Sequence, residues 1–100
     1  MDEKVIDNLM SEIIENSRFN QISQEQKEIL KYKLFEKFIS VIYLTALDLL
    51  EDSKKEEFSK LLATKNNKDI STYIDNNIQN YPNLMEKAIN KFSEEVEDYF

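Results

Sequence analysis

Glycine is absent from this chain of 100 residues. Tight turns between β-strands often need a backbone φ above zero, which glycine adopts at little steric cost, so a chain without glycine is poorly suited to hairpins. Leucine, glutamate and lysine are abundant and favour helices, while asparagine and serine can cap them. The sequence therefore predicts an all-α protein.

Apolar residues recur at helical spacing along most of the chain. The stripe of the first such stretch comprises Val5, Ile6, Leu9, Met10, Ile13 and Ile14. Five helices are predicted, over about residues 3–17, 24–50, 54–64, 69–79 and 82–98. No linker or repeat divides the chain, so we expect residues 1–100 to form a single domain. Its expected architecture is a compact orthogonal bundle, in which residues 38–50 are central and the third and fourth helices form a hairpin across them.

Local signals predict where the helices begin. A Ser or Thr followed three residues later by Glu or Gln is typical of a capping box. The expected start signals are capping boxes at Ser23 with Gln26 and at Ser53 with Glu56, an N-cap at Asn67 or Asp69, and Pro82 at a first helical position.

The segment 38–50, FISVIYLTALDLL, is the least polar part of the chain. Thirteen helical residues span about 20 Å, short of the roughly 30 Å of a bilayer core, and the polar sequence EDSKKEE follows at once. Helical periodicity runs into the segment from Leu30 and Leu34. We therefore expect the buried second half of a long central helix, with other helices packed around it, and no membrane span.

The predicted core combines one apolar face from each helix. Its expected members are Leu9, Ile13, Leu34, Phe38, Ile42, Leu49, Phe58, Leu62, Ile74, Ile78, Met85, Ile89 and Phe92. In the last helix the expected inner seam runs through Met85, Ile89, Phe92, Val96 and Tyr99.

Composition excludes several kinds of chemistry. The chain has no histidine or cysteine, which removes histidine-based catalysis, thiolate nucleophiles and metal sites built on these ligands, and it has no glycine for a phosphate-binding loop. Asp48 is the one acid inside the apolar segment. We interpret it as pointing outward or pairing with a lysine, in preference to a catalytic acid of raised pKa. We expect no enzyme activity, no cofactor and no metal site.

The charge is unevenly distributed. The net charge is −7, yet the segment 54–68 carries five lysines against two glutamates. These lysines are Lys54, Lys55, Lys60, Lys65 and Lys68. The segment joins two short helices in the manner of a helix-turn-helix, and DISTYIDNNIQN after it offers polar side chains for base edges. That stretch has two aspartates and no basic residue, so a solvated lysine-rich face is favoured over nucleic-acid binding.

The C-terminal sequence SEEVEDYF crowds acids at a helix end, where the helix dipole favours cations. Its candidate interaction residues are Glu94, Glu95, Glu97, Asp98, Tyr99 and Phe100. Either this end frays into solvent or a basic partner compensates its charge. The two aromatics are expected to fold back onto the core, and the alternative is that they anchor a partner.

The segment TALDLLEDSKKEEFSKLL, with ISTYIDNNIQNYPNLMEKAINKF after it, resembles a small all-helical bacterial family of unknown function, found chiefly in uncultured bacteria with reduced genomes. The resemblance rests on Ala46, Leu47, Leu50, Glu57, Phe58, Leu61, Leu62, Tyr81, Pro82 and Asn83. It covers roughly residues 35–100. Tyr81 departs from an expected aliphatic residue, and the family's usual glycines are missing. The resemblance implies a compact cytoplasmic helical fold and no activity.

Three functional hypotheses follow. The leading one is a non-catalytic protein-interaction or adaptor module with an unidentified protein partner, because catalytic residues are missing and the acidic surface carries a lysine patch. The first alternative is a nucleic-acid-associated regulator that uses residues 54–68. The second is a structural protein that self-associates through an unpaired apolar stripe, such as that of the first helix.

Overall fold

The computed structural model of the protein describes residues 3–97. Five α-helices follow one another: α1 (Glu3–Glu15), α2 (Gln24–Leu49), α3 (Asp52–Ala63), α4 (Asn67–Asn77) and α5 (Tyr81–Glu97). The described part of the chain contains no strand. The prediction of an all-α bundle of five helices is confirmed.

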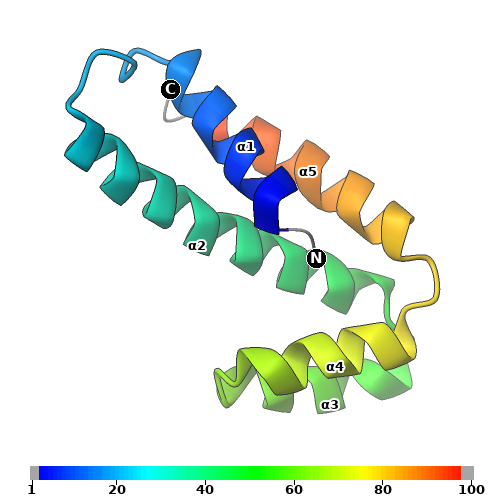
Figure 1. The fold of residues 1–100 in the computed structure, drawn as a ribbon. Helices are drawn as coiled ribbons and strands as arrows, with labels where there is room; N and C mark the ends of the chain where they lie inside the picture. Colours follow the sequence, from blue (N-terminus) through cyan, green and yellow to red (C-terminus); the bar gives the residue numbers. More distant parts are fainter. Residues whose placement is uncertain (1–2, 98–100) are drawn as a thin grey trace.

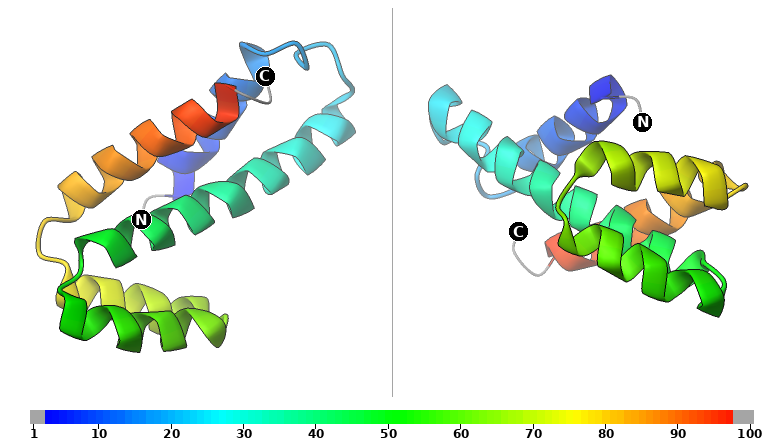
Figure 2. Two further views of the ribbon diagram at one scale, coloured as in Figure 1. Left: turned by 180° about the vertical axis from the view of Figure 1, so that it is seen from behind. Right: turned by 90° about the horizontal axis from the view of Figure 1, so that it is seen from below.

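Helix α2 is the central element of the fold. Helices α1 and α5 lie along it, and α5 makes the most extensive contacts with it (Figure 1). The α3–α4 hairpin packs at the C-terminal end of α2, as the views from behind and below also show (Figure 2). The resulting molecule is elongated, with extents of 47 × 23 × 23 Å.

The capping box at the start of α2 is confirmed. Ser23 Oγ accepts a hydrogen bond from the Gln26 backbone N–H at 3.2 Å, and Gln26 Oε1 accepts one from the Ser23 N–H at 3.3 Å. Two backbone donors that the helix itself cannot satisfy are thereby paired. This cap fixes the point where the α1–α2 connection ends and α2 begins.

The predicted capping box at Ser53 and Glu56 is wrong. Helix α3 begins at Asp52, its N-cap is Glu51, and no side chain caps it. The reason is tertiary: Leu50 is buried with an extended backbone directly after α2, so the chain turns at Leu50 and Glu51 and restarts the helix at once. Ser53 therefore lies inside the first turn, where it cannot serve as the N-cap.

Helix α4 begins two residues earlier than predicted and α5 one residue earlier. Asn66, not Asn67 or Asp69, caps α4 by accepting from the Asp69 N–H at 3.2 Å. A left-handed backbone at Lys65, with φ of 57°, makes the short turn that brings Asn66 into this position. At α5, Asn80 Oδ1 accepts from the Asn83 N–H at 3.1 Å, which makes Pro82 the second residue of the helix and not the first. Proline is tolerated there because first-turn N–H groups have no partner within the helix.

The first core cluster joins α1, α2 and α5. Its buried members are Ile6, Met10, Ile14, Leu34, Phe38, Val41, Ile42, Ala88, Phe92 and Val96. The rings of Phe38 and Phe92 meet edge to face at 5.0 Å between centroids. Ile6, Met10 and Ile14 of the α1 stripe are thus buried against helices of the same chain, whereas Val5 is 60% exposed. Self-association through this stripe stays a prediction.

The second core cluster joins the end of α2 to α3, α4 and the start of α5. Its buried members are Ala46, Leu50, Phe58, Ile70, Ile74 and Leu84. The rings of Phe58 and Tyr73 stack at 5.4 Å and tie the two helices of the hairpin together. Tyr43 packs against both clusters, and its hydroxyl donates to Asn67 Oδ1 at 3.0 Å.

The predicted core is partly confirmed. Its buried members are Leu34, Phe38, Ile42, Phe58, Ile74 and Phe92. Its partly buried members are Leu9, Ile13, Leu49, Leu62, Ile78, Met85 and Ile89. In α5 the buried residues are Leu84, Ala88, Phe92 and Val96, so Phe92 and Val96 of the predicted seam are confirmed, whereas Leu84 and Ala88 are buried in place of Met85 and Ile89. Ala88 is fully buried in the cluster that joins α5 to α2, whereas Met85 and Ile89 are partly buried at its edge.

Segment 38–50 is helical as far as Leu49 and buried on its core-facing side, but the expectation of neighbours all round it is wrong. Phe38, Ile42 and Ala46 are buried, whereas Leu44 is 59% exposed. The four other helices cover only the core-facing side of α2, because each also needs its own apolar face buried. Within the described residues, no helix is long and apolar enough to cross a membrane.

Candidate interaction surface

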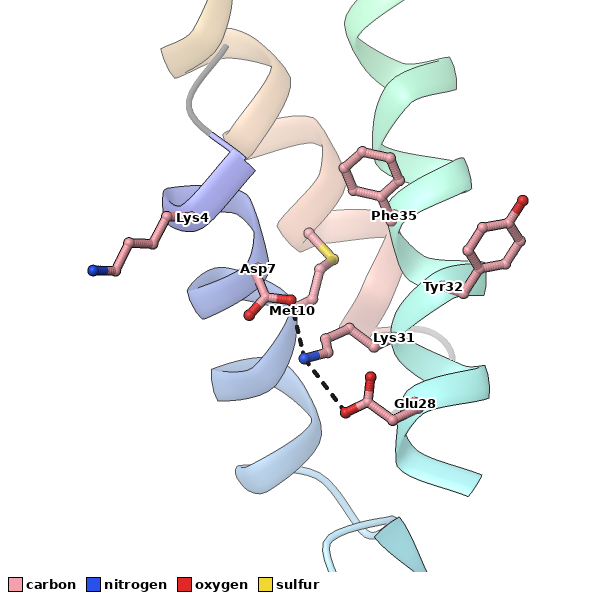
Figure 3. Close-up of a pocket in the computed structure, with 7 residues that line it drawn as sticks. All are labelled: Lys4, Asp7, Met10, Glu28, Lys31, Tyr32 and Phe35. Carbon is pink, nitrogen blue, oxygen red and sulfur yellow. Dashed lines mark ion pairs between the residues drawn. The ribbon is translucent and has the colours of Figure 1, made fainter. Parts of the chain in front are cut away.

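A groove with a volume of about 690 Å³ lies between α1 and the first half of α2. It is lined by Lys4, Asp7, Met10, Glu28, Lys31, Tyr32 and Phe35 (Figure 3). Met10 is fully buried and Phe35 is half-buried, and both lie between the two helices. Tyr32 projects outward from α2 at the groove's edge and is 65% exposed. The groove thus has an apolar base and an exposed aromatic edge.

An ion-pair network crosses the groove. Lys31 Nζ lies 3.0 Å from Asp7 Oδ1 on α1 and 3.7 Å from Glu28 Oε1 one turn earlier on α2 (Figure 3). The hydrogen bond to Asp7 is the largest cause that raises the pKa of the Lys31 ammonium. Burial is the next in size and acts in the opposite direction, and the charges of Asp7 and Glu28 add to the rise. Lys31 is therefore charged at neutral pH and ties α1 to α2.

The hydroxyl of Tyr32 stays neutral at physiological pH. A hydrogen bond with Glu36 raises the pKa of Tyr32, and the negative charge of that carboxylate adds to the effect. An exposed neutral tyrosine offers a partner both apolar area and a polar group at little conformational cost. The edge of the groove has the chemistry that protein interfaces favour.

The two acids that line the groove are paired with a lysine. Asp7 and Glu28 both contact Lys31, and the described residues contain no group of three acids placed to hold a metal ion. No buried side-chain polar atom of the described residues lacks a hydrogen-bond partner. The arrangement offers apolar area with a charged rim of both signs, which fits an amphipathic segment of another chain.

The five predicted lysines lie on the α3–α4 hairpin but do not share one face. Lys55 pairs with Asp52 at 3.4 Å and Lys60 with Glu56 at 3.6 Å, each on α3. At 3.6 residues per turn, Lys55 and Lys60 are about 140° apart around the helix. The remaining three are Lys54 at the start of α3, Lys65 in the turn and Lys68 in α4, and none has a described carboxylate within ion-pair distance. The structure disperses this charge over the hairpin.

The predicted acidic residues lie at the opposite end of the molecule. Glu94, Glu95 and Glu97 are exposed in the last turns of α5, far from the hairpin (Figure 1). Glu95 pairs with Lys37 of α2 at 3.3 Å. Asp98, Tyr99 and Phe100 lie outside the described residues. The structure therefore does not bring the acidic and basic groups of the candidate surface together.

Asp48 behaves as the sequence interpretation expects. Its side chain is 68% exposed and its Oδ2 lies 3.2 Å from Lys91 Nζ on α5. An exposed ion pair of this kind contributes little to stability but helps to orient the two helices.

The groove between α1 and α2 was missed at the level of sequence. Its polar residues come from two helices, and pairing Asp7 with Lys31 requires their relative placement. One signal was present: Tyr32 lies away from the face of α2 that carries Leu34 and Phe38, so its ring had no predicted burial site.

No protein-family model, curated protein or solved structure matches this chain. The resemblance to a bacterial helical family therefore stays a prediction from the residues alone.

Proposed function

We propose that this chain is a non-catalytic protein-interaction module that binds an amphipathic helix of a partner protein in the α1–α2 groove. The observation that carries the proposal is the pairing of half-buried Phe35 with exposed Tyr32 beside a groove of about 690 Å³. Aromatic side chains at such positions are typical anchors of protein interfaces. The resemblance described above extends the proposal to a cytoplasmic bacterial protein.

The placement of the helices supports a helical ligand. The α5 side of α2 is marked by the Lys37–Glu95 ion pair, whereas the groove side is marked by Tyr32. Lys37 and Tyr32 are about 140° apart around α2. A partner helix in the groove would therefore pack on α1 and α2 from the side away from α5, giving four helices around one apolar centre.

The charge supports a partner with lysine or arginine beside its apolar stripe. The net charge of the chain is −7, and Glu25, Glu28 and Glu36 lie along the exposed side of α2 near the groove. Charge of opposite sign on the partner speeds association and fixes orientation. The same net charge disfavours nucleic acid as the ligand.

Site-specific photo-crosslinking in cells tests the proposal. Three variants would each carry one benzoylphenylalanine residue. It replaces Tyr32 at the groove in the first, Val5 as the control in the second, and Lys65 at the hairpin turn in the third. Val5 is 60% exposed and does not line the groove. We expect protein adducts from position 32 and not from position 5. An absence of protein adducts from position 32 would reject the proposal. If position 65 also gave adducts to nucleic acid, the result would favour a nucleic-acid-associated regulator.

A further inference from the structure

A second uncovered apolar surface lies on α2, away from the groove. Leu44 is 59% exposed although it belongs to the least polar segment of the chain. It borders a hollow of about 310 Å³ between α2 and α5, lined by Val41, Leu44, Leu47, Asp48, Lys91 and Glu95. Leu44 is about 120° from Tyr32 around α2, so this surface and the groove are separate.

Four residues on this side of α2 follow the spacing of a coiled-coil seam. Lys37, Val41, Leu44 and Asp48 are separated by four, three and four residues, and at 100° per residue they fall within an arc of roughly 60°. The two apolar residues lie in the middle, with a positive charge at one end and a negative charge at the other. Leu44 is exposed, whereas Val41 is a buried core residue that reaches the surface only in the lining of the hollow. Such a seam is complementary to itself when a second copy runs antiparallel.

We propose that this seam is a contact between two copies of the chain, with their α2 helices antiparallel and a two-fold axis between positions 42 and 43. In this register Leu44 packs against Val41 of the second copy, and Lys37 faces Asp48 of the second copy. The symmetry repeats both contacts, as it does in any isologous dimer. Each Leu44 side chain enters the hollow beside Val41 of the other copy, as a knob enters a hole.

The charges within each copy are already arranged for this contact. Lys37 Nζ lies 3.3 Å from Glu95 Oε2, and Asp48 Oδ2 lies 3.2 Å from Lys91 Nζ. Placing Lys37 against Asp48 of the second copy joins these two pairs into a row of alternating sign: Glu95, Lys37, then Asp48 and Lys91 of the second copy. No like charges meet in this row, and it forms twice in the dimer. The contact leaves the α1–α2 groove open, so the dimer would present two grooves and bind a partner bivalently.

Sedimentation equilibrium of the full chain over a concentration series tests the dimer. We expect the wild-type chain to move from monomer to dimer as its concentration rises. Leu44→Glu should raise the dimer Kd by roughly 100-fold, because both copies lose an apolar contact and bury a charge. Val5→Glu and Tyr32→Glu make the same kind of change at exposed apolar side chains elsewhere and should leave Kd unchanged. Circular dichroism checks that every variant is folded.

A charge exchange tests the register itself. Lys37→Glu alone and Asp48→Lys alone each place like charges opposite one another, so each variant should be monomeric. Mixed together, the two variants restore opposite charges at both ends and should form a heterodimer. A wild-type chain that is monomeric at every concentration, a Leu44→Glu dimer as strong as wild type, or a mixture that stays monomeric would each overturn the proposal. These outcomes are independent of crosslinking at Tyr32, so the proposed function stands or falls separately.

Discussion

Replacement of Phe38 by alanine probes the packing that holds the three long helices together. The Phe38 side chain is fully buried in the cluster shared by α1, α2 and α5, and its ring meets Phe92 at 5.0 Å. Truncation removes the ring and leaves a cavity between helices that other contacts hold apart. The loss therefore includes both the transfer free energy of the ring and the free energy of the cavity.

The expected loss in the free energy of unfolding is about 3–5 kcal/mol, of which the edge-to-face contact with Phe92 contributes roughly 0.5–1.5 kcal/mol. A chain of this size has a total stability of about 5–15 kcal/mol, so the variant remains folded unless the wild type lies at the low end. Urea denaturation followed by circular dichroism at 222 nm measures the loss. With a slope of about 2 kcal/mol/M, a loss of 4 kcal/mol lowers the midpoint by about 2 M.

Tyr32→Ala is the matched control, because it truncates an aromatic side chain of the same helix that is 65% exposed. Its effect should stay within about 0.5 kcal/mol. A Phe38→Ala loss below about 1.5 kcal/mol, or equal losses for the two variants, would refute the placement of Phe38 at the centre of the core. A double variant with Phe92→Ala should lose less than the sum of the single losses, because the two rings share one contact.

Two further predictions concern a cap and an ion pair. Ser23→Ala should lower the free energy of unfolding by about 1 kcal/mol through loss of the capping box. Ser53→Ala, inside the first turn of α3, should change it by less than about 0.5 kcal/mol in the same urea titration. Equal effects of the two substitutions would contradict the assigned caps. Lys31→Gln should be less stable than wild type at neutral pH. Because the pKa of Lys31 is raised in the folded state, the ion pairs give stability that is lost as the ammonium deprotonates. Urea titrations across pH should therefore show the difference in unfolding free energy between the two proteins vanish as the pH rises above about 10.5. A difference that instead grows with rising pH would exclude the Lys31 network as its source.

Helix content could be predicted because it depends on local pattern. The absence of glycine, the capping box at Ser23 and the spacing of apolar residues each act within a few residues of sequence. The start of α3 could not be predicted, because the burial of Leu50 sets it. That burial depends on the hairpin and on α5, which lie far along the chain. Local capping signals at Ser53 were present but were overridden by tertiary packing.

The core residues could be predicted only to within one helical position. Each apolar stripe is two residues wide, as with Leu84 and Met85 or Ala88 and Ile89 in α5. Which of the two is buried depends on the side from which α2 approaches, and that is a property of the assembled bundle. The groove was beyond prediction for the same reason, since its two walls come from α1 and α2 and meet only in the folded chain.

The apolar character of α2 exceeds what the other helices cover, and this excess underlies the two proposed binding surfaces. A chain of 100 residues has too little mass to surround a helix of 26 residues on every side. The core takes the face with Phe38, which leaves Tyr32 on one flank and Leu44 on the other, each beside a hollow. Burying either residue against another chain would gain free energy that this fold leaves unused, so the two proposed contacts, one with a partner and one with a second copy, would both draw on the same surplus of apolar surface.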